Sequence, residues 1–241
     1  MIKANHSKWA DQIFKFYILR LMRKHFYSLN ILGEVPVLSS RRPILLLPNH
    51  FSWWDGFFVY LMNLKFFQRP LYLMMLEEQL TKYQFFSKVG AYSIDLNNSK
   101  GVIESLKYTV KILKQTVEPA PLVCMFPQGE MFPPGKRPIR VKSGYQWIIN
   151  HLDKDIITLP LGIRIEYLDQ QLPEVFFQLG KPVVDSKKLD GTALEKRLTE
   201  ILDSMLDPIS AKNRGSVILS GKKSVSEQWG QFVDNFKSGK Q

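Results

Sequence analysis

The chain has 241 residues, of which 45% are hydrophobic and 23% are charged, a composition that excludes disordered, collagen-like and low-complexity proteins. Its one cysteine, Cys124, excludes an intrachain disulfide and any cysteine-based zinc or iron–sulfur site. Lysine and arginine number 33 against 22 acidic residues, and the net charge of +11 predicts an anionic partner: nucleic acid, an acidic membrane surface or a phosphorylated substrate.

Positive charge is concentrated at the start of the chain. Residues 1–25 contain six lysines and arginines and a single acidic residue, Asp11. These charges interrupt every apolar stretch, so neither a signal peptide nor a membrane span is predicted. Apolar and aromatic residues recur near helical spacing over residues 7–29, which predicts an amphipathic helix. Such a helix suits either the protein core or the headgroup layer of a membrane, and its interleaved aromatic and basic residues favour the membrane.

Strand and helix signals alternate along the rest of the chain. The predicted elements are strands over 44–47, 71–76, 92–95, 122–126, 156–161 and 175–179, and helices over 53–65, 78–88, 101–115, 144–152, 191–206 and 224–236. Strands separated by helices of about 10–15 residues indicate βαβ units. The predicted fold class is therefore α/β, with a mostly parallel central sheet flanked by helices. We find no repeat and no linker, so residues 31–241 are predicted to form a single domain after an N-terminal helical segment, residues 1–30.

Two turns that follow predicted strands carry polar side chains suited to chemistry. The first turn runs from Pro48 to Asp55, and the second from Phe126 to Glu130. Ligands of open α/β sheets gather beyond the carboxyl ends of strands, where both turns are expected.

His50 and Asp55 in the first turn are predicted to form a pair. Five helical steps turn a residue by about 140° around the axis, so the two cannot share one face of a continuous helix. If Ser52 caps the helix, Asp55 lies three residues in, and its carboxylate faces back toward His50. A neutral histidine held in one tautomer by a carboxylate can activate a hydroxyl. In the structural alternatives, Asp55 only completes a capping box with Ser52, and His50 bonds only to backbone.

Three segments, in this order along the chain, resemble the signatures of the lysophospholipid acyltransferase family, typified by 1-acylglycerol-3-phosphate acyltransferase: Asn49-His50 with Asp55, Phe126-Pro127-Gln128-Gly129, and Leu159-Pro160-Leu161-Gly162-Ile163. The resemblance covers residues 40–165. It implies transfer of a fatty acyl group from an acyl-CoA or acyl-carrier-protein thioester to a hydroxyl of a lipid acceptor. His50 would be the general base and Asp55 would orient it. No cofactor is expected, and no histidine or acidic residues have the spacing of a metal site.

The chain departs from the family pattern where the family places arginines for the acceptor's phosphate. Gln128 replaces a glutamate, Glu130-Met131 replaces a Thr-Arg pair, and Leu96 replaces a second arginine. Neither leucine nor methionine can hold phosphate as the arginine fork does. Either the nearby loop cations bind the phosphate, or the acceptor is not a phosphate monoester; those cations are Lys136, Arg137, Arg140 and Lys142. The predicted substrate-binding residues are Asn49, Phe126, Pro127, Gln128, Gly129, Glu130, Arg137, Arg140 and Lys142.

Two alternatives to an active enzyme stay open. One is a non-catalytic basic protein that binds membranes or nucleic acid, although no nucleic-acid-binding signature is present and no nucleic acid partner is expected. The other is an inactive member of the acyltransferase fold, against which the retained His50 and Asp55 argue. The enzyme is expected to be a peripheral, monotopic protein at the cytoplasmic face of the membrane.

Overall fold

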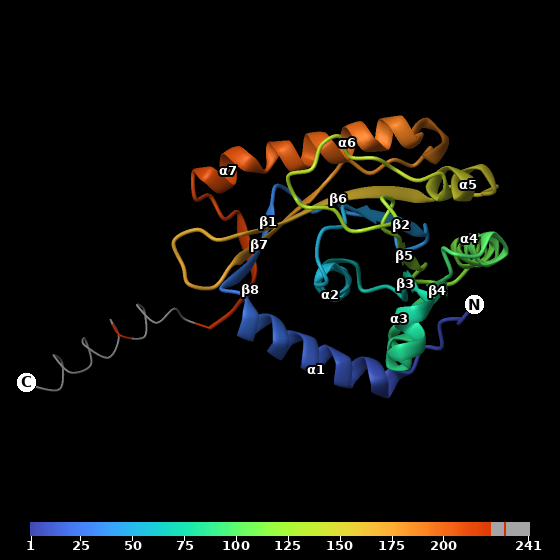
Figure 1. Ribbon diagram of the computed structural model, residues 1–241, viewed down its shortest axis with the longest axis horizontal. Coiled ribbons are helices and arrows are strands. Elements are labelled where there is room, and N and C mark those ends of the chain that lie inside the picture. Colours follow the sequence, from blue (N-terminus) through green and yellow to red (C-terminus); the bar gives the residue numbers. More distant parts are fainter. Residues whose placement is uncertain (223–228, 230–241) are drawn as a thin grey trace, which may run out of the picture.

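The computed structural model describes residues 1–222 and Trp229, and this part of the chain contains one eight-stranded sheet (Figure 1). Its strands are β1 (Ser28–Leu32), β2 (Ile44–Pro48), β3 (Leu71–Leu76), β4 (Ala91–Ile94), β5 (Leu122–Cys124), β6 (Ile157–Glu166), β7 (Glu174–Leu179) and β8 (Ser216–Ser220). They lie in the order β4-β3-β5-β2-β6-β7-β1-β8. The β6–β7 and β1–β8 pairs are antiparallel, and the other neighbours are parallel. The predicted, mostly parallel sheet is confirmed.

Helices cover both faces of the sheet. They are α1 (Lys8–His25), α2 (Asp55–Met62), the π-helical η1 (Asn63–Phe67), α3 (Glu77–Lys82), the 3₁₀ helix η2 (Gln84–Val89), α4 (Ser99–Leu113), α5 (Gly144–Asn150), the 3₁₀ turn η3 (Ser186–Lys188), α6 (Gly191–Ser204) and α7 (Leu206–Ser210). One apolar core joins α1 and α2 to the sheet, and a second joins α4, α5, α6 and α7 to it. Figure 1 shows α1 on one side of the molecule and α6 with α7 on the other.

The short helix α2 explains why α1 packs where it does. Residues 57–62 of α2 are all buried, and a helix that is apolar all round needs cover on more than one side. The sheet covers one side of α2 and α1 covers another. The Phe14 ring on α1 contacts the Tyr60 ring on α2 edge to face, with 4.8 Å between the ring centroids. The buried stripe of α1 has a spacing of four residues and consists of Ala10, Phe14, Ile18 and Met22. The predicted N-terminal helix therefore packs on the core through one face.

Several element boundaries differ from the prediction. The helix predicted over 7–29 ends at His25, and β1 begins at Ser28 between β7 and β8. Neither β1 nor β8 was predicted. The apolar residues of α1 continue through Phe26 into β1, so no boundary is visible in the sequence. β8 is a mostly exposed strand and lacks a buried apolar run. The strand predicted over 122–126 ends at Cys124. The helix predicted over 78–88 divides into α3 and η2, and the one predicted over 224–236 lies outside the described residues except for Trp229.

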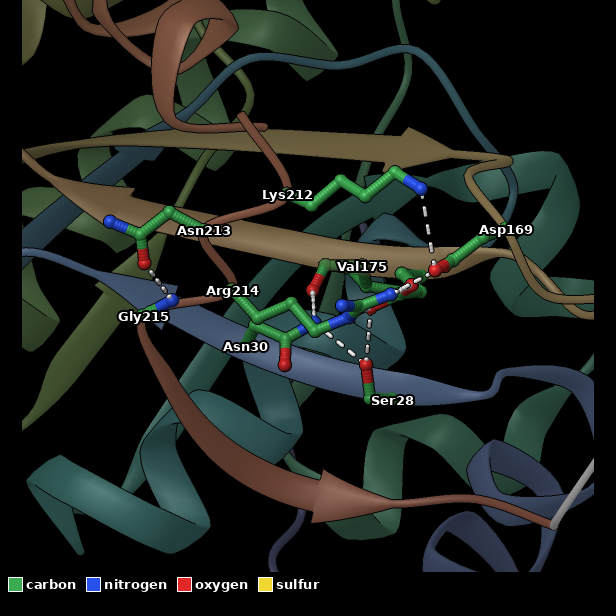
Figure 2. A network of polar contacts seen from close by, with 9 residues as sticks. Ser28, Asn30, Asp169, Val175, Lys212, Asn213, Arg214 and Gly215 are labelled. Carbon is green, nitrogen blue, oxygen red and sulfur yellow. Dashed lines mark hydrogen bonds and ion pairs between the residues drawn. The ribbon is translucent and has the colours of Figure 1, made fainter. Parts of the chain in front are cut away.

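A polar network fastens the segment before β8 to the sheet (Figure 2). The fully buried carboxylate of Glu174 accepts a hydrogen bond from Ser28 Oγ at 2.9 Å. Arg214 grips the same carboxylate with Nε and Nη2, at 2.6 and 2.7 Å, and reaches Asp169 with Nη2 at 2.6 Å. The pKa of Arg214 is raised, and the hydrogen bond to Glu174 is the largest cause. Arg214 thus neutralises a carboxylate that has no access to water.

We expect Arg214→Met to lower the free energy of unfolding by about 3 kcal/mol, because it leaves Glu174 buried without a counter-charge. Adding Glu174→Gln should restore much of that loss. Denaturant unfolding measures both effects. The control is Lys212→Met, since this exposed lysine forms its ion pair with the outer carboxylate, Asp169. Equal destabilisation by Arg214→Met and Lys212→Met would contradict the role given to the buried pair.

Candidate active site

The two polar turns identified in the sequence meet at one edge of the sheet. β2 and β5 are parallel neighbours, with Leu46 opposite Cys124, so the turns that follow them leave the sheet side by side. The His50 ring stacks on the Phe126 ring, with 4.1 Å between centroids and 20° between planes. The His50 carbonyl also accepts a hydrogen bond from the Phe132 amide at 3.0 Å. The two turns therefore contact each other through both side chain and backbone.

The predicted contact between His50 and Asp55 is present. His50 Nδ1 and Asp55 Oδ2 are 2.7 Å apart, with the Asp55 side chain fully buried and the His50 side chain 22% exposed. Because a carboxylate only accepts hydrogen bonds, Nδ1 carries the proton, and in the neutral ring Nε2 keeps a free lone pair. The partly exposed ring can therefore take a proton at Nε2.

The carboxylate of Asp55 is held by backbone as well as by His50. Oδ2 accepts the amides of Phe51 at 2.8 Å and Ser52 at 3.0 Å, and Oδ1 accepts the Ser52 hydroxyl at 2.9 Å. The predicted helix position of Asp55 was wrong: α2 begins at Asp55 itself, because residues 52–54 form a separate turn. Asp55 still faces back along the chain, and it caps the turn and holds His50 at the same time.

Asn49 lines the pocket beside the histidine and also positions the chain before it. Its buried side-chain amide bonds both backbone groups of Ile163, with Nδ2 to the carbonyl at 3.1 Å and Oδ1 to the amide at 2.7 Å. Because Ile163 lies on β6, next to β2 in the sheet, this clamp fixes the chain immediately before His50. The third sequence signature, which contains Ile163, thus supports the first.

The second signature also supports the histidine. The buried Gln128 side chain accepts the His50 amide on Oε1 at 2.8 Å, so the amide that replaces the family's carboxylate still anchors the turn. Gly129 has φ +71°, and a Cβ there would lie 2.7 Å from the Lys142 side chain, which favours glycine. The Pro127 carbonyl accepts the Lys142 amide at 2.8 Å, and Glu130 pairs with the Lys142 ammonium at 3.3 Å.

Most of the loop cations predicted to bind phosphate have carboxylate partners. Arg137 pairs with Asp203 at 2.7 Å, Arg140 with Glu195 at 3.1 Å, and Lys142 with Glu130, as described above. The partners of both arginines lie on α6. Three of the four loop cations that the sequence offers for a phosphate therefore have a carboxylate partner.

Lys136 differs from its neighbours. Its ammonium lies 4.2 Å from the centre of the Phe132 ring, and among residues 1–222 and Trp229 no carboxylate pairs with it. A small surface pocket beside the histidine is lined by residues that include His50, Gln128, Phe132, Lys136 and Arg137. The sequence could not separate Lys136 from the other loop cations. The carboxylates that pair with Arg137 and Arg140 are remote in the chain, so the sequence alone does not reveal which cations are paired.

Other chemistries find little support near this pocket. Burial raises the pKa of the Cys124 thiol well above its usual value, so this side chain is a poor nucleophile. In the part of the chain that the structure describes, no group of three or more histidine, cysteine or acidic side chains is arranged to hold a metal ion.

Comparisons with known proteins agree with this arrangement. Residues 34–164, more than half of the chain, match a family model described as Acyltransferase. The fold is similar to that of the crystal structure of the 1-acyl-sn-glycerophosphate (LPA) acyltransferase PlsC from Thermotoga maritima. That match has a TM-score of 0.53 and 15% sequence identity, and covers 85% of this chain and 79% of PlsC. No curated protein sequence matches significantly.

Proposed function

The chain belongs to the acyltransferase family, and from this premise we propose that it transfers a fatty acyl group from an acyl-CoA or acyl-carrier-protein thioester to a hydroxyl of a lipid, with His50 as general base. The observation that carries the proposal is the His50–Asp55 contact at the carboxyl end of β2, beside a pocket open to the surface. The same contact argues against an inactive member of the family.

The proposed reaction needs one base and no covalent acyl-enzyme. His50 Nε2 takes the proton of the acceptor hydroxyl as the oxygen attacks the thioester carbonyl carbon, and Asp55 stabilises the resulting imidazolium. The tetrahedral intermediate then collapses, the carbon–sulfur bond breaks, and the departing thiolate receives the proton from His50. The products are one ester and one free thiol.

We propose that the acceptor carries no phosphate monoester. The acceptor named for PlsC, 1-acyl-sn-glycerophosphate, is such a monoester, and its dianionic phosphate would need cations free to bind it. Here Arg137, Arg140 and Lys142 are paired with carboxylates. Lys136 alone would be a weak site for a dianion. A lipid whose hydroxyl belongs to a sugar, an amino acid or another headgroup without a phosphate monoester would not need such cations.

Substituting both paired arginines tests this view of the acceptor. We expect Arg137→Gln with Arg140→Gln to change the acceptor KM by less than about threefold, since exposed ion pairs contribute little. Loss of two phosphate contacts, at about 1.5–3 kcal/mol each, would instead raise KM tens-fold or more. Steady-state kinetics with the purified enzyme decide. Efficient acylation of lysophosphatidic acid, lost in the double variant, would overturn the proposed acceptor and leave the acyltransferase activity standing.

Lipid profiling of a strain that lacks the gene identifies the acceptor. We expect one class of acylated lipid to disappear, its unacylated precursor to accumulate, and the purified enzyme to acylate that precursor. An unchanged lipid profile, together with no acylation of an extract of membrane lipids by the pure enzyme, would contradict the proposed function.

We also propose a peripheral, monotopic attachment to the cytoplasmic face of the membrane through α1. Outside its buried stripe, α1 presents apolar side chains to solvent, which we call the exposed stripe: Trp9, Ile13, Phe16 and Tyr17, between 51% and 71% exposed. Among the described residues, no helix is both long and apolar enough to cross a bilayer. Aromatic residues beside lysines and arginines suit the headgroup layer, where the helix would lie flat.

A further inference from the structure

The carboxyl-terminal half of α1 and the residues after β8 form a groove rich in positive charge. We call it the basic groove; its lining is Phe16, Arg20, Arg23, Lys24, Gly221 and Lys222. It is formed by other elements than the His50 pocket, and the proposed reaction uses none of its residues.

The fold brings these side chains together from distant parts of the sequence. Phe16, Arg20 and Lys24 are spaced four residues apart and share one side of the helix. Lys222 joins them because its amide bonds the Arg23 carbonyl at 3.0 Å. A Cβ at Gly221 would overlap the Phe26 carbonyl oxygen, so glycine permits this close approach of the two backbones.

The basic groove has four cations that, among the described residues, have no carboxylate partner. Within residues 1–222 and Trp229, no carboxylate forms an ion pair with Arg20, Arg23, Lys24 or Lys222, in contrast to the paired cations near His50. The carboxyl end of the helix dipole favours Arg23 and Lys24, but four like charges around one groove repel one another. An anion bound between them would remove this repulsion.

The position of the basic groove beside the exposed stripe indicates which kind of molecule carries the anion. Phe16 belongs both to the basic groove and to the exposed stripe of α1. With the exposed stripe in the acyl boundary of a bilayer, the cations would lie at the level of the lipid phosphates. We propose that the basic groove binds the phosphate of an anionic phospholipid headgroup, so that the enzyme prefers anionic membranes. This proposal rests on the proposed attachment of α1 to the membrane.

Flotation of the full chain with lipid vesicles tests the proposal. The vesicles contain phosphatidylcholine alone or phosphatidylcholine mixed with phosphatidylglycerol. Wild type should bind the anionic vesicles more tightly than the neutral ones. Each cation near an anionic surface contributes about fivefold in binding, so Arg20→Gln, Arg23→Gln and Lys222→Gln together should weaken binding to anionic vesicles on the order of 100-fold. Binding to neutral vesicles should not change.

A matched variant separates the basic groove from total charge. Lys100, Lys107 and Lys111 lie exposed on α4, on the other face of the sheet from α1. Their replacement by glutamine lowers the net charge by the same three units, from +11 to +8, and should leave vesicle binding nearly unchanged. Acyl transfer to detergent-dispersed lipid should persist in both triple variants and shows that they fold.

The outcomes distinguish failure of this proposal from failure of the proposed attachment. If wild type bound both kinds of vesicle equally, or if the two triple variants lost vesicle binding equally, the proposal that the basic groove binds anionic lipid would be wrong. The proposed attachment through α1 would still stand. Absence of binding to either vesicle would overturn the attachment through α1 as well. Displacement by inorganic phosphate, beyond that by chloride at the same ionic strength, would mean that the basic groove takes a soluble phosphate compound, and would overturn the assignment to a lipid.

Discussion

Purified His50→Ala enzyme is expected to transfer acyl groups about 10²–10⁴-fold more slowly than wild type, the usual contribution of a general base. Its thermal unfolding should stay close to that of wild type, since the ring is partly exposed and its main apolar contact is the stacked Phe126. Initial rates at saturating donor and acceptor give the ratio.

The control for this substitution is His151→Ala. His151 also stacks on an aromatic ring, that of Trp147, and its Nδ1 lies 2.8 Å from the Trp147 carbonyl oxygen. It lies after α5, outside the His50 pocket, so its loss should leave the rate unchanged. Near-normal turnover of His50→Ala with unaltered stability would remove His50 from the mechanism.

Substitution of two apolar residues of the exposed stripe should release the enzyme from membranes. Burial of a large apolar side chain stabilises by about 2 kcal/mol, so Trp9→Ser with Ile13→Ser should weaken binding to neutral vesicles on the order of 10³-fold. Both side chains are more than half exposed, and neither lines the basic groove, so the fold and the anion site should persist. Flotation of the purified chain measures the change.

A second pair of exposed apolar residues controls for this variant. Ile103 on α4 and Leu206 at the start of α7 lie on the other face of the sheet and are 37% and 41% exposed. Ile103→Ser with Leu206→Ser should leave vesicle binding intact. Equal binding of the two double variants, or release of wild type by high salt alone, would show that apolar burial by α1 does not hold the enzyme on the membrane.

Local sequence patterns were sufficient to predict most of the strands and helices. The apolar run at residues 44–47 ends in a Pro-Asn turn, and such bounded runs were recognised as strands. β1 was missed because residues 26–32 continue the apolar content of α1 without a turn signal. β8 was missed because it is a short edge strand, of which Leu219 alone is buried. Its place depends on partners in β1, nearly the whole chain away.

The same distinction holds for the candidate site. His50 and Asp55 are five residues apart, so helix geometry and capping rules were enough to predict their contact. Arg137 and Asp203 are 66 residues apart, and Arg140 and Glu195 are 55 apart. These ion pairs exist because α6 packs beside the 130–142 loop, which no local pattern predicts. Charge alone therefore indicates where a phosphate could bind, but it does not show that the fold gives these arginines carboxylate partners at the surface.

If His50 is the general base for transfer of an acyl group to a lipid hydroxyl, one thiol is released for each ester formed, and an assay that counts both products tests this stoichiometry. Wild type and His50→Ala are incubated side by side with a labelled acyl thioester and an extract of membrane lipids, and free thiol and labelled lipid ester are measured over time. We expect one ester for each thiol released by wild type, and almost none of either from His50→Ala. Thiol release without ester formation, or equal ester formation by the two proteins, would contradict it.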